Sequence, residues 1–509
     1  MAVIGRIIKG VYYDSVTLMR VSGKMSVSDE VEEVSIVMGT AANKSILEAS
    51  GMMLPEFTGA GDADLLLVVR LADSTNGESV LDQLEEDLKS STKQDSATTE
   101  FNPSSMEGAL EVLPEANLAL ISVAGQYAGA VAANALNQGL HVMIFSDNVP
   151  VETERRLKES ARDKGLLVMG PDCGTAIING IPLGFANAVP RGTIGIVAAS
   201  GTGLQEVTSI IANEGCGISQ AIGTGGHDLK SDIGGIMFME GIKALDTDPD
   251  TDVIVLISKP PDAPVLEKIQ AIVNKAQTPI IAFYLGEEPK PGQPSTLEDT
   301  ALMAVAHVKG LPPESVTEKL AETNQKISEM STKIARSCGP KARFVRGLFS
   351  GGTFCSEAQT LFVNELSPLY SNIPVKGAHS LDDPMVSTGH TVIDLGDDQF
   401  TMGRPHPMID FSLRRKRLLA EAADEKTAVI LLDVVLGYGS NPDPAAELEE
   451  AIKSVSGTVP VICSVTGTDQ DFQNKPSTIQ RLTAAGAVVM SSNAAACRLT
   501  LAVLNQLNQ

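Results

Sequence analysis

The chain has 509 residues, 43% of them hydrophobic, and this length predicts about three to four domains with buried cores. Its 63 acidic and 39 basic residues give a formal net charge of −24, which argues against nucleic acids and anionic membranes as partners. Six scattered cysteines without a C-x-x-C motif, and no run of ~18 apolar residues, predict a cytoplasmic protein without a disulfide framework, a zinc site or a membrane span.

Residues 1–100 predict a small α/β module. Short apolar runs alternate there with helical patterns, which we expect near 14–27, 41–51 and 80–89. The polar segment SSTKQDSATTEFNPSS follows, and it has few apolar residues to bury. We interpret it as a linker or an exposed loop.

Residues 101–190 predict a Rossmann-like domain. The strand patterns NLALISVAG, HVMIFSDN and LLVMGPDCGTAI are separated by two helical patterns, the second of them the charged VETERRLKESARDKG. This βαβ rhythm is typical of a parallel sheet with crossover helices.

Residues 191–335 and 341–509 predict two copies of one flavodoxin-like unit. In the first copy the strand TIGIVAAS leads into a Ser-Gly-Thr-Gly loop and a helix, and in the second RFVRGLFS leads into Ser-Gly-Gly-Thr and a helix. The later strands DVIVLIS and TPIIAFY correspond to AVILLDVV and VPVICSV. A polar helix near 315–336 bridges the copies. The fold class is therefore multidomain α/β, which suits a chain with 45 glycines and 4% aromatic residues.

The two serine loops are candidate phosphate sites. Glycines permit a sharp turn, and the first N–H groups of the next helix are free to bind an anion. The residues are Ser200, Gly201, Thr202 and Gly203 in the first copy, and Ser350, Gly351, Gly352 and Thr353 in the second. Two helix N-termini facing one anion would add their partial charges. The alternative is that each serine only caps an ordinary helix.

Two further loops are candidate substrate sites, each with a plain turn as the alternative. The first holds Gly225, Gly226 and His227, and the second holds Pro171, Asp172 and Cys173 at the carboxyl end of a strand, where open α/β sheets bind ligands. Because no basic residue or histidine stands near Cys173 to lower its pKa, a structural role for this thiol is favoured over a nucleophilic one.

The segment 394–410 has the densest set of reactive side chains. Arg404 is suited to bidentate binding of a carboxylate or phosphate, and two prolines restrict the backbone around His406. Asp410 closes the segment as a further substrate-binding candidate. A turn with fortuitous charges is the alternative. The basic run 414–417 that follows is interpreted as a solvated helix face or an interface.

These motifs resemble a known family. The stretch from GLLVMGPDCGTAIING to IVAASGTGLQEV is similar to succinyl-CoA synthetase α subunits, and FVRGLFSGGTFCSEA looks like the carboxyl-terminal domain of the β subunit. The whole chain resembles the FdrA proteins through YDSVTLM, SDNVPVE, MGPDCGTAIING, ISKPP, RGLFSGGT and GRPHPMID. The resemblance implies a CoA-binding-type domain at 101–190, an α-like domain at 191–335 and a β-like domain at 341–509.

The chain departs from the synthetases at the histidine that carries phosphate in their G-H-A-G-A motif. The corresponding segment here, AFYLGEEPKPGQPSTLEDTALMA, contains no histidine. The glycine-rich CoA loop is unrecognisable, and no segment is assigned to an ATP-grasp domain. Ligation driven by a nucleoside triphosphate is therefore not expected of this chain alone.

The FdrA resemblance implies a subunit of oxamate carbamoyltransferase in purine and allantoin breakdown, which converts oxalurate and phosphate into oxamate and carbamoyl phosphate. Inorganic phosphate is then a substrate. We assign Arg404 to binding the substrate carboxylate or carbamoyl phosphate, and His406 to moving a proton or donating to the developing oxyanion. No metal is predicted, and CoA remains a candidate ligand. Companion subunits and an oligomer are expected. The alternatives are an acyl-CoA synthetase whose nucleotide-binding subunit is separate, and a noncatalytic scaffold that binds a phosphorylated metabolite.

Overall fold

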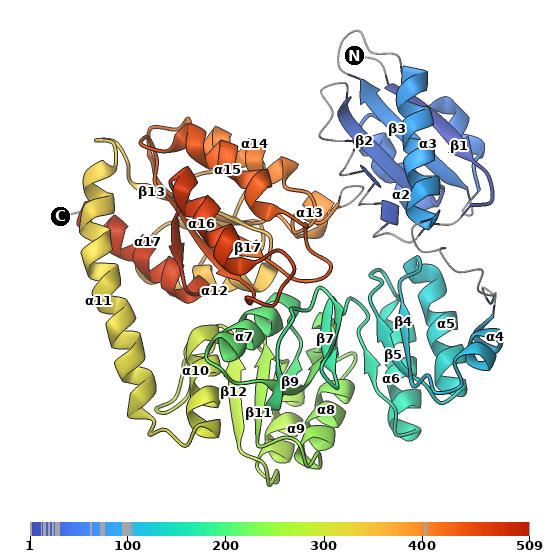
Figure 1. Cartoon of the computed structure of the whole chain (residues 1–509), viewed down its shortest axis with the longest axis horizontal. Helices are drawn as coiled ribbons and strands as arrows, with labels where there is room; N and C mark the ends of the chain where they lie inside the picture. Colours follow the sequence, from blue (N-terminus) through green and yellow to red (C-terminus); the bar gives the residue numbers. More distant parts are fainter. Residues whose placement is uncertain are drawn as a thin grey trace. The chain divides into compact units, whose positions relative to one another are not determined.

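The computed structural model describes residues 3–11, 13, 17, 18, 21, 22, 25, 31–61, 64–71, 77–93, 103, 105–401 and 405–507 (Figure 1). The chain forms two compact units. The first comprises Met1–Ala116 and Asp397–Ser412, and the second comprises Asn117–Gly396 and Leu413–Gln509. Among the described residues, no helix has both the length and the apolar character that a membrane span requires.

The amino-terminal part of the first unit is an antiparallel sheet with buried side chains on both faces. The strands, in the order β1-β3-β2, are β1 (Val3–Ile8), β3 (Leu65–Leu71) and β2 (Val31–Met38). The helices are α2 (Ala41–Ala49), α3 (Gly77–Lys93) and α4 (Met106–Val112). Alternate residues of β3 pack with α3 on one face and with Leu47 and Phe57 on the other. The helix expected at 14–27 and the polar segment 90–105 lie largely outside the described residues.

The second unit begins with the parallel sheet β4-β5-β6 that the βαβ rhythm predicts. Its strands are β4 (Leu118–Ile121), β5 (His141–Ile144) and β6 (Val168–Met169), and its helices are α5 (Gly125–Asn137) and α6 (Val151–Asp163). The hairpin of β7 (Thr175–Ile178) and β8 (Ile181–Gly184) precedes residue 190 and pairs with the next sheet. Asn179 and Gly180, between these two strands, adopt the positive φ angles of a tight turn.

The next sheet has the order β12-β11-β9-β10-β7-β8. Its remaining strands are β9 (Arg191–Ala198), β10 (Ile218–Gly223), β11 (Val253–Ser258) and β12 (Ile280–Tyr284). The helices of this region are α7 (Gly201–Asn213), η2 (Gly226–Leu229), α8 (Ile236–Asp246), α9 (Ala263–Val273), α10 (Leu297–Val308) and α11 (Glu314–Ser337). Every residue of β11 is buried, as expected for a parallel strand that is covered on both faces.

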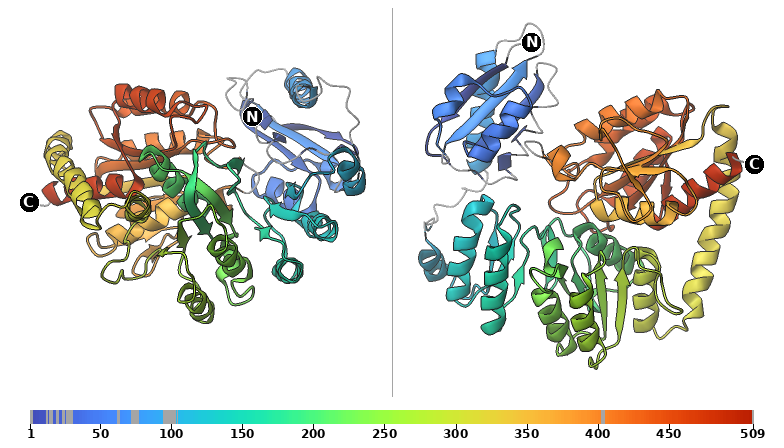
Figure 2. Two further views of the ribbon diagram at one scale, coloured as in Figure 1. Left: turned by 60° about the horizontal axis from the view of Figure 1, so that its bottom comes forward. Right: turned by 180° about the vertical axis from the view of Figure 1, so that it is seen from behind.

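The last sheet is parallel and has the order β15-β14-β16-β13-β17-β18-β19 (Figure 2). Its strands are β13 (Phe344–Phe349), β14 (Leu369–Ser371), β15 (His379–Ser380), β16 (His390–Asp394), β17 (Thr427–Val435), β18 (Val461–Thr466) and β19 (Val488–Met490). The helices that accompany it in the second unit are α12 (Gly352–Phe362), α14 (Ser412–Ala422, from Leu413 on), α15 (Pro444–Val455), α16 (Lys475–Ala485) and α17 (Asn493–Leu507).

The two larger sheets repeat one topology. Strand β9 lies between β10 and β11 with β12 beyond, and β13 lies between β16 and β17 with β18 beyond. Strand β9 leads into α7, and β13 leads into α12. The matching of strands in the sequence is therefore confirmed by their equivalent places in the two sheets.

Candidate functional site

The start of α7 presents unpaired N–H groups. Ser200 is the N-cap, and its hydroxyl oxygen accepts a hydrogen bond from the N–H of Gly203 at 3.0 Å. Among the described residues, the N–H groups of Gly201 and Thr202 have no acceptor, and Gly201 is exposed. This helix start therefore has the donors and the access that an anion site needs.

The start of α12 is different, because its donors are already occupied. The N–H and the hydroxyl of Ser350 donate to the carboxylate of Asp433, each at 2.7 Å, and the N–H of Gly351 donates to the same carboxylate at 3.0 Å. Asp433 is fully buried and also pairs with Arg414 at 2.9 Å. The donors with which Ser350 and Gly351 are predicted to bind phosphate thus bind an internal carboxylate in this structure.

A second carboxylate lies beside α12. A Cβ atom built on Gly352 would be 2.7 Å from the Oδ2 atom of Asp394, so this side chain lies against the first turn of the helix. Asp394 is buried, with 7% of its surface exposed. A carboxylate near a helix N-terminus neutralises part of the positive potential of the helix end. Less of this potential is then available to attract an external anion.

The two helix starts touch each other. The hydroxyl oxygens of Ser200 and Thr353 are 2.6 Å apart, and one of them donates to the other. Gly351 allows this approach, because a Cβ atom there would be 2.8 Å from the side chain of Thr202. Since each hydroxyl has one proton, the pair leaves one O–H free to donate to a bound anion. The structure thus brings the two predicted loops together.

Two buried glutamates lie about two turns further along the same helices. Asn493, at the start of α17, holds both: its N–H donates to Glu206 on α7 at 2.9 Å, and its side-chain amide donates to Glu357 on α12 at 2.8 Å. Burial raises the pKa of Glu206, and burial raises the pKa of Glu357 to about 7, with nearby Glu206 and Glu298 adding to the effect. The sequence reasoning missed this pair, although a glutamate follows the serine by six or seven residues in both copies.

The loops 170–174 and 223–228 also meet. Gly225 has a φ of +79°, and a Cβ atom there would lie 2.2 Å from the carbonyl oxygen of Pro171. Asp172 and Gly226 are exposed, but Cys173 is 3% exposed, and burial raises the pKa of its thiol to about 12. The buried thiol of Cys173 therefore fits the structural role that the sequence favours over a nucleophilic one.

His227 is 65% exposed, and its Nδ1 atom is 3.5 Å from the carboxylate of Glu154. Its neighbour Asp228 is fully buried and pairs with Lys158 at 2.9 Å, while Lys158 also pairs with Glu154 at 2.7 Å. The buried lysine thus anchors this loop to α6 and leaves the imidazole of His227 at the surface.

The remaining predicted residues do not lie in the unit that holds the serine loops. His406 and Asp410 belong to Asp397–Ser412 of the first unit, where Met408 N–H donates to His406 Nδ1 at 3.3 Å and Ser412 N–H donates to Asp410 at 2.7 Å. Arg404 lies outside the described residues.

The basic run 414–417 is not a solvated face throughout, because Arg414 is fully buried and Arg417 is 4% exposed. Arg414 neutralises Asp433, and Arg417 pairs with Glu421. Periodicity alone could not identify the pair of Arg414, since Asp433 comes from a strand, whereas Arg417 and Glu421 stand four residues apart on one helix.

The segment that replaces the histidine motif of the synthetases ends at the start of α10. Thr296 caps this helix, and Leu297 is fully buried with its N–H donating to Glu357 at 2.8 Å. No histidine occurs between residues 282 and 304. This position has no group that can carry phosphate as a phosphohistidine.

Comparison with known proteins identifies the family of this chain. The protein YahF of Escherichia coli K12, described as uncharacterized, is 39% identical over 489 residues, which cover 95% of each chain. The chain belongs to the YahF family. Residues 348–503 match a CoA-ligase model, residues 191–286 match a CoA binding domain, and residues 1–103 match an "AllF, heavy metal-associated domain".

More distant relatives are acid–CoA ligases. The α subunit of ADP-forming succinate–CoA ligase from Methanothermobacter thermautotrophicus is 30% identical over 183 residues, which cover 35% of this chain and 60% of that subunit. A solved acetyl-coenzyme A synthetase from Ca. Korarchaeum cryptofilum is 16% identical, with 77% of this chain and 82% of that chain covered and a TM-score of 0.29. The two ligase-type domain matches and the similarity to succinate–CoA ligase make the YahF-family chain part of the succinyl-CoA synthetase-like superfamily. The match to the CoA binding domain, residues 191–286, lies in the region that the resemblance assigns to the α-like domain. It does not lie in residues 101–190.

Residues 1–103 contain neither cysteine nor histidine, so methionine is the soft-metal ligand that this part of the chain offers. Among the described residues of the whole chain, no group of three or more His, Cys, Asp or Glu side chains is placed to hold a metal ion.

The carboxyl edge of the β4-β5-β6 sheet does not fit the phosphates of CoA. Its loops, residues 122–126, 145–150 and 170–174, contain Asp147 and Asp172 and no lysine or arginine. The space beside Gly125 at the start of α5 is filled by the chain itself, since a Cβ atom there would lie 2.2 Å from the carbonyl oxygen of Asp147. An anion of several charges finds no cationic side chain in these loops.

Proposed function

We propose that the chain is the acyl-transfer subunit of a succinyl-CoA synthetase-like enzyme, in which inorganic phosphate reacts at the start of α7 and a companion subunit binds the nucleotide. The observation that carries this proposal is the open start of α7, with Gly201 and Thr202 N–H groups unpaired and the Ser200–Thr353 hydroxyl pair beside them. The ligase-type domains and the succinate–CoA ligase relatives support the acyl-CoA substrate class.

In the proposed reaction a phosphate oxygen attacks the carbonyl carbon of an acyl-CoA thioester. The C–O bond forms, the C–S bond breaks, and the proton of hydrogen phosphate goes to the leaving thiolate, so that acyl phosphate and free CoA result. The N–H groups of Gly201 and Thr202 hold phosphate oxygens, and the free hydroxyl proton of the serine–threonine pair donates to the same anion. Direct attack needs no phosphohistidine, in keeping with the absence of a histidine between residues 282 and 304.

Carbamoyl transfer is the second candidate. Oxalurate and phosphate then give oxamate and carbamoyl phosphate, with phosphate held at the same helix start. The missing histidine between 282 and 304 and the FdrA-like motifs favour this candidate. The substrate binding predicted from the sequence for Arg404 and the proton transfer predicted for His406 remain predictions in this version.

The deciding experiment removes a single N–H group from the start of α7. Gly201→Pro deletes one donor at the first helical position, where proline is compatible with the helix, and Ser200 already has the extended backbone that precedes proline (φ −162°, ψ 114°). Gly201→Ala is the matched control, because its Cβ atom meets only Thr175 at 3.6 Å. We expect phosphate binding and turnover to fall roughly tenfold to hundredfold in the proline variant only. Equal behaviour of the two variants would contradict the proposal.

The acyl donor is identified by following phosphate with ³¹P NMR in mixtures of the chain and its companion subunits. Acyl phosphate formed from an acyl-CoA supports the ligase-like version, and carbamoyl phosphate formed from oxalurate supports the second candidate. Phosphate binding without turnover in every mixture would instead support a scaffold.

A further inference from the structure

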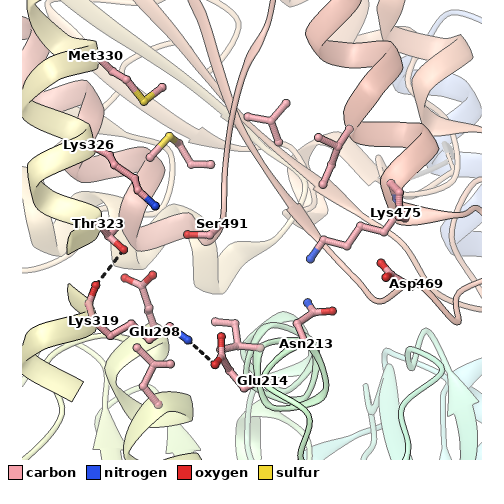
Figure 3. Close-up of a pocket in the computed structure, with 16 residues that line it drawn as sticks. Asn213, Glu214, Glu298, Lys319, Thr323, Lys326, Met330, Asp469, Lys475 and Ser491 are labelled. Carbon is pink, nitrogen blue, oxygen red and sulfur yellow. Dashed lines mark hydrogen bonds and ion pairs between the residues drawn. The ribbon is translucent and has the colours of Figure 1, made fainter. Parts of the chain in front are cut away.

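A large cavity lies at the opposite end of α7 from the phosphate site. Its volume is about 870 Å³, and it is bounded by the end of α7, by α10 and α11, and by α16 and the turn after β19 (Figure 3). Helix α7 has 13 residues, so at 1.5 Å per residue the cavity lies about 20 Å from Ser200. It is therefore separate from the start of α7.

One part of the cavity wall is apolar. Ile210 of α7, Leu302 of α10, Ile479 of α16 and Met490 of β19 contribute side chains to it. Three of these side chains are less than 10% exposed, namely Ile210, Leu302 and Met490. Such a wall matches the hydrocarbon part of a ligand.

The charged groups of the wall fall into paired and unpaired ones. Glu214 pairs with Lys319, and Glu298 pairs with Arg498 at 2.6 Å. Lys326 of α11 has no ion-pair partner among the described residues, and Figure 3 shows its side chain directed into the cavity. Asp469 also lines the wall and has no ion-pair partner among the described residues, so Lys326, Lys475 and one carboxylate remain, with a net positive charge available to a ligand.

Lys475, at the start of α16, is the more informative group. Its ammonium has three N–H donors, but the carbonyl of Gly467, at 3.0 Å, is its one acceptor among the described residues. Burial lowers the pKa of Lys475, and the carboxylates of Glu206, Asp469 and Asp471 oppose this effect. Two donors of a partly buried ammonium therefore face the cavity without acceptors (Figure 3).

We propose that this cavity is a second binding site, for a small organic anion with an apolar body, whose carboxylate is bound by Lys475 and Lys326. The anion supplies the acceptors that the ammonium of Lys475 lacks, and its hydrocarbon part covers the wall formed by Ile210, Leu302 and Ile479. Because Ile210 and the cavity residues Asn213 and Glu214 belong to the end of α7, a bound anion contacts the helix that begins at the phosphate site.

Octanoate and 1-octanol are suitable probes, since they share an apolar body and differ in charge. In NMR titrations of the full chain we expect saturable octanoate binding, about tenfold or more tighter than octanol binding. Lys475→Met keeps the apolar stem and removes the charge, so octanoate binding falls about tenfold while octanol binding is unchanged. Lys333→Met is the control, because Lys333 is exposed on α11 and does not line the cavity.

A second variant tests the location by filling the cavity. Ile479→Trp is expected to abolish binding of both probes, whereas Gly201→Pro and saturating inorganic phosphate leave octanoate binding unchanged. This last comparison separates the present proposal from the proposed function, since either can fail alone. The proposal is wrong if octanoate does not bind saturably, if Lys475→Met or Ile479→Trp binds it as the unaltered chain does, or if phosphate displaces it.

Discussion

The loops before α7 and α12 have nearly the same sequence pattern and different chemistry. Before α7, Ser200 caps the helix and two N–H groups stay unpaired, whereas before α12 the donors of Ser350 and Gly351 bind Asp433. The difference depends on a residue of the neighbouring strand, which is β11 beside β9 and β17 beside β13. Ile257 of β11 pairs with Ala198, and Leu432 of β17 pairs with Leu348, so the next residues, Ser258 and Asp433, occupy equivalent places.

Ser258 and Asp433 explain why one helix start is open and the other closed. Ser258 is buried, and its hydroxyl has no partner among the described residues, while Asp433 has a full negative charge that Arg414 balances. A buried carboxylate next to a helix start acts as a permanent anion. The start of α7 therefore has unpaired donors and the start of α12 has occupied ones, and α12 contributes the hydroxyl of Thr353 to the pair with Ser200.

The largest expected effect comes from removing that internal anion. Asp433→Ala leaves Arg414 buried without its counter-charge and frees three hydrogen-bond donors, so the free energy of unfolding should fall by about 3–5 kcal/mol. Urea denaturation measures this change. The double variant Asp433→Ala/Arg414→Met is the control, and it should recover part of the loss. A loss below 1 kcal/mol in the single variant would show that the α12 loop does not depend on Asp433.

The next effect concerns Glu357 on α12. Its folded pKa of about 7 lies above the ordinary value of 4.5, so the folded state retains a proton that the unfolded state releases. The contribution of Glu357 to the free energy of unfolding is therefore largest below about pH 4.5. This contribution is lost as the pH rises towards 7, by an amount on the order of 3 kcal/mol.

Glu357→Gln removes this pH dependence, because glutamine stays neutral. The free energy of unfolding of the variant, relative to that of the unaltered chain, should be higher at about pH 8 than at about pH 5. Urea denaturation at both pH values measures this difference. Glu365→Gln, at a site in the turn after α12, is the control and should not change the pH profile. Parallel profiles for the unaltered chain and Glu357→Gln would mean that Glu357 is ionised at both pH values.

A smaller effect follows from exchanging the residue beneath the α7 loop. Ser258→Asp places a carboxylate where α12 has Asp433, so phosphate binding should weaken about tenfold as the added charge competes for the helix start. Ser258→Asn has a similar size without charge and is the control. Calorimetric titration with phosphate checks both variants, and equal affinities would argue against a charge effect at this position.

The smallest effect is the contact between the helix starts. A double-mutant cycle with Ser200→Ala and Thr353→Val should give a coupling energy of about 1 kcal/mol, since the two hydroxyls share one hydrogen bond. Thermal or urea unfolding of the four proteins provides the measurement. Additive changes in stability would mean that the hydroxyl pair contributes nothing beyond its separate members.

Much of the fold follows from local patterns. The alternation of apolar strands and helices in the second unit, the repeat of its two larger sheets and the helix near 315–336 are all visible in the chain, because each depends on neighbouring residues. The pairing of β7 with β10 could not be predicted in this way, since it joins residues more than 40 positions apart.

The candidate site was likewise predictable only in the parts that depend on local sequence. Its two serine loops were recognisable from glycine and serine spacing, and no histidine stands where the synthetases have one. Tertiary structure alone decided that Asp433, 83 positions from Ser350, closes one loop, and that Asn493 joins Glu206 to Glu357. Helix starts and turns arise from local backbone geometry, whereas occupied donors and shifted pKa values depend on burial and on partners that only the folded chain brings together.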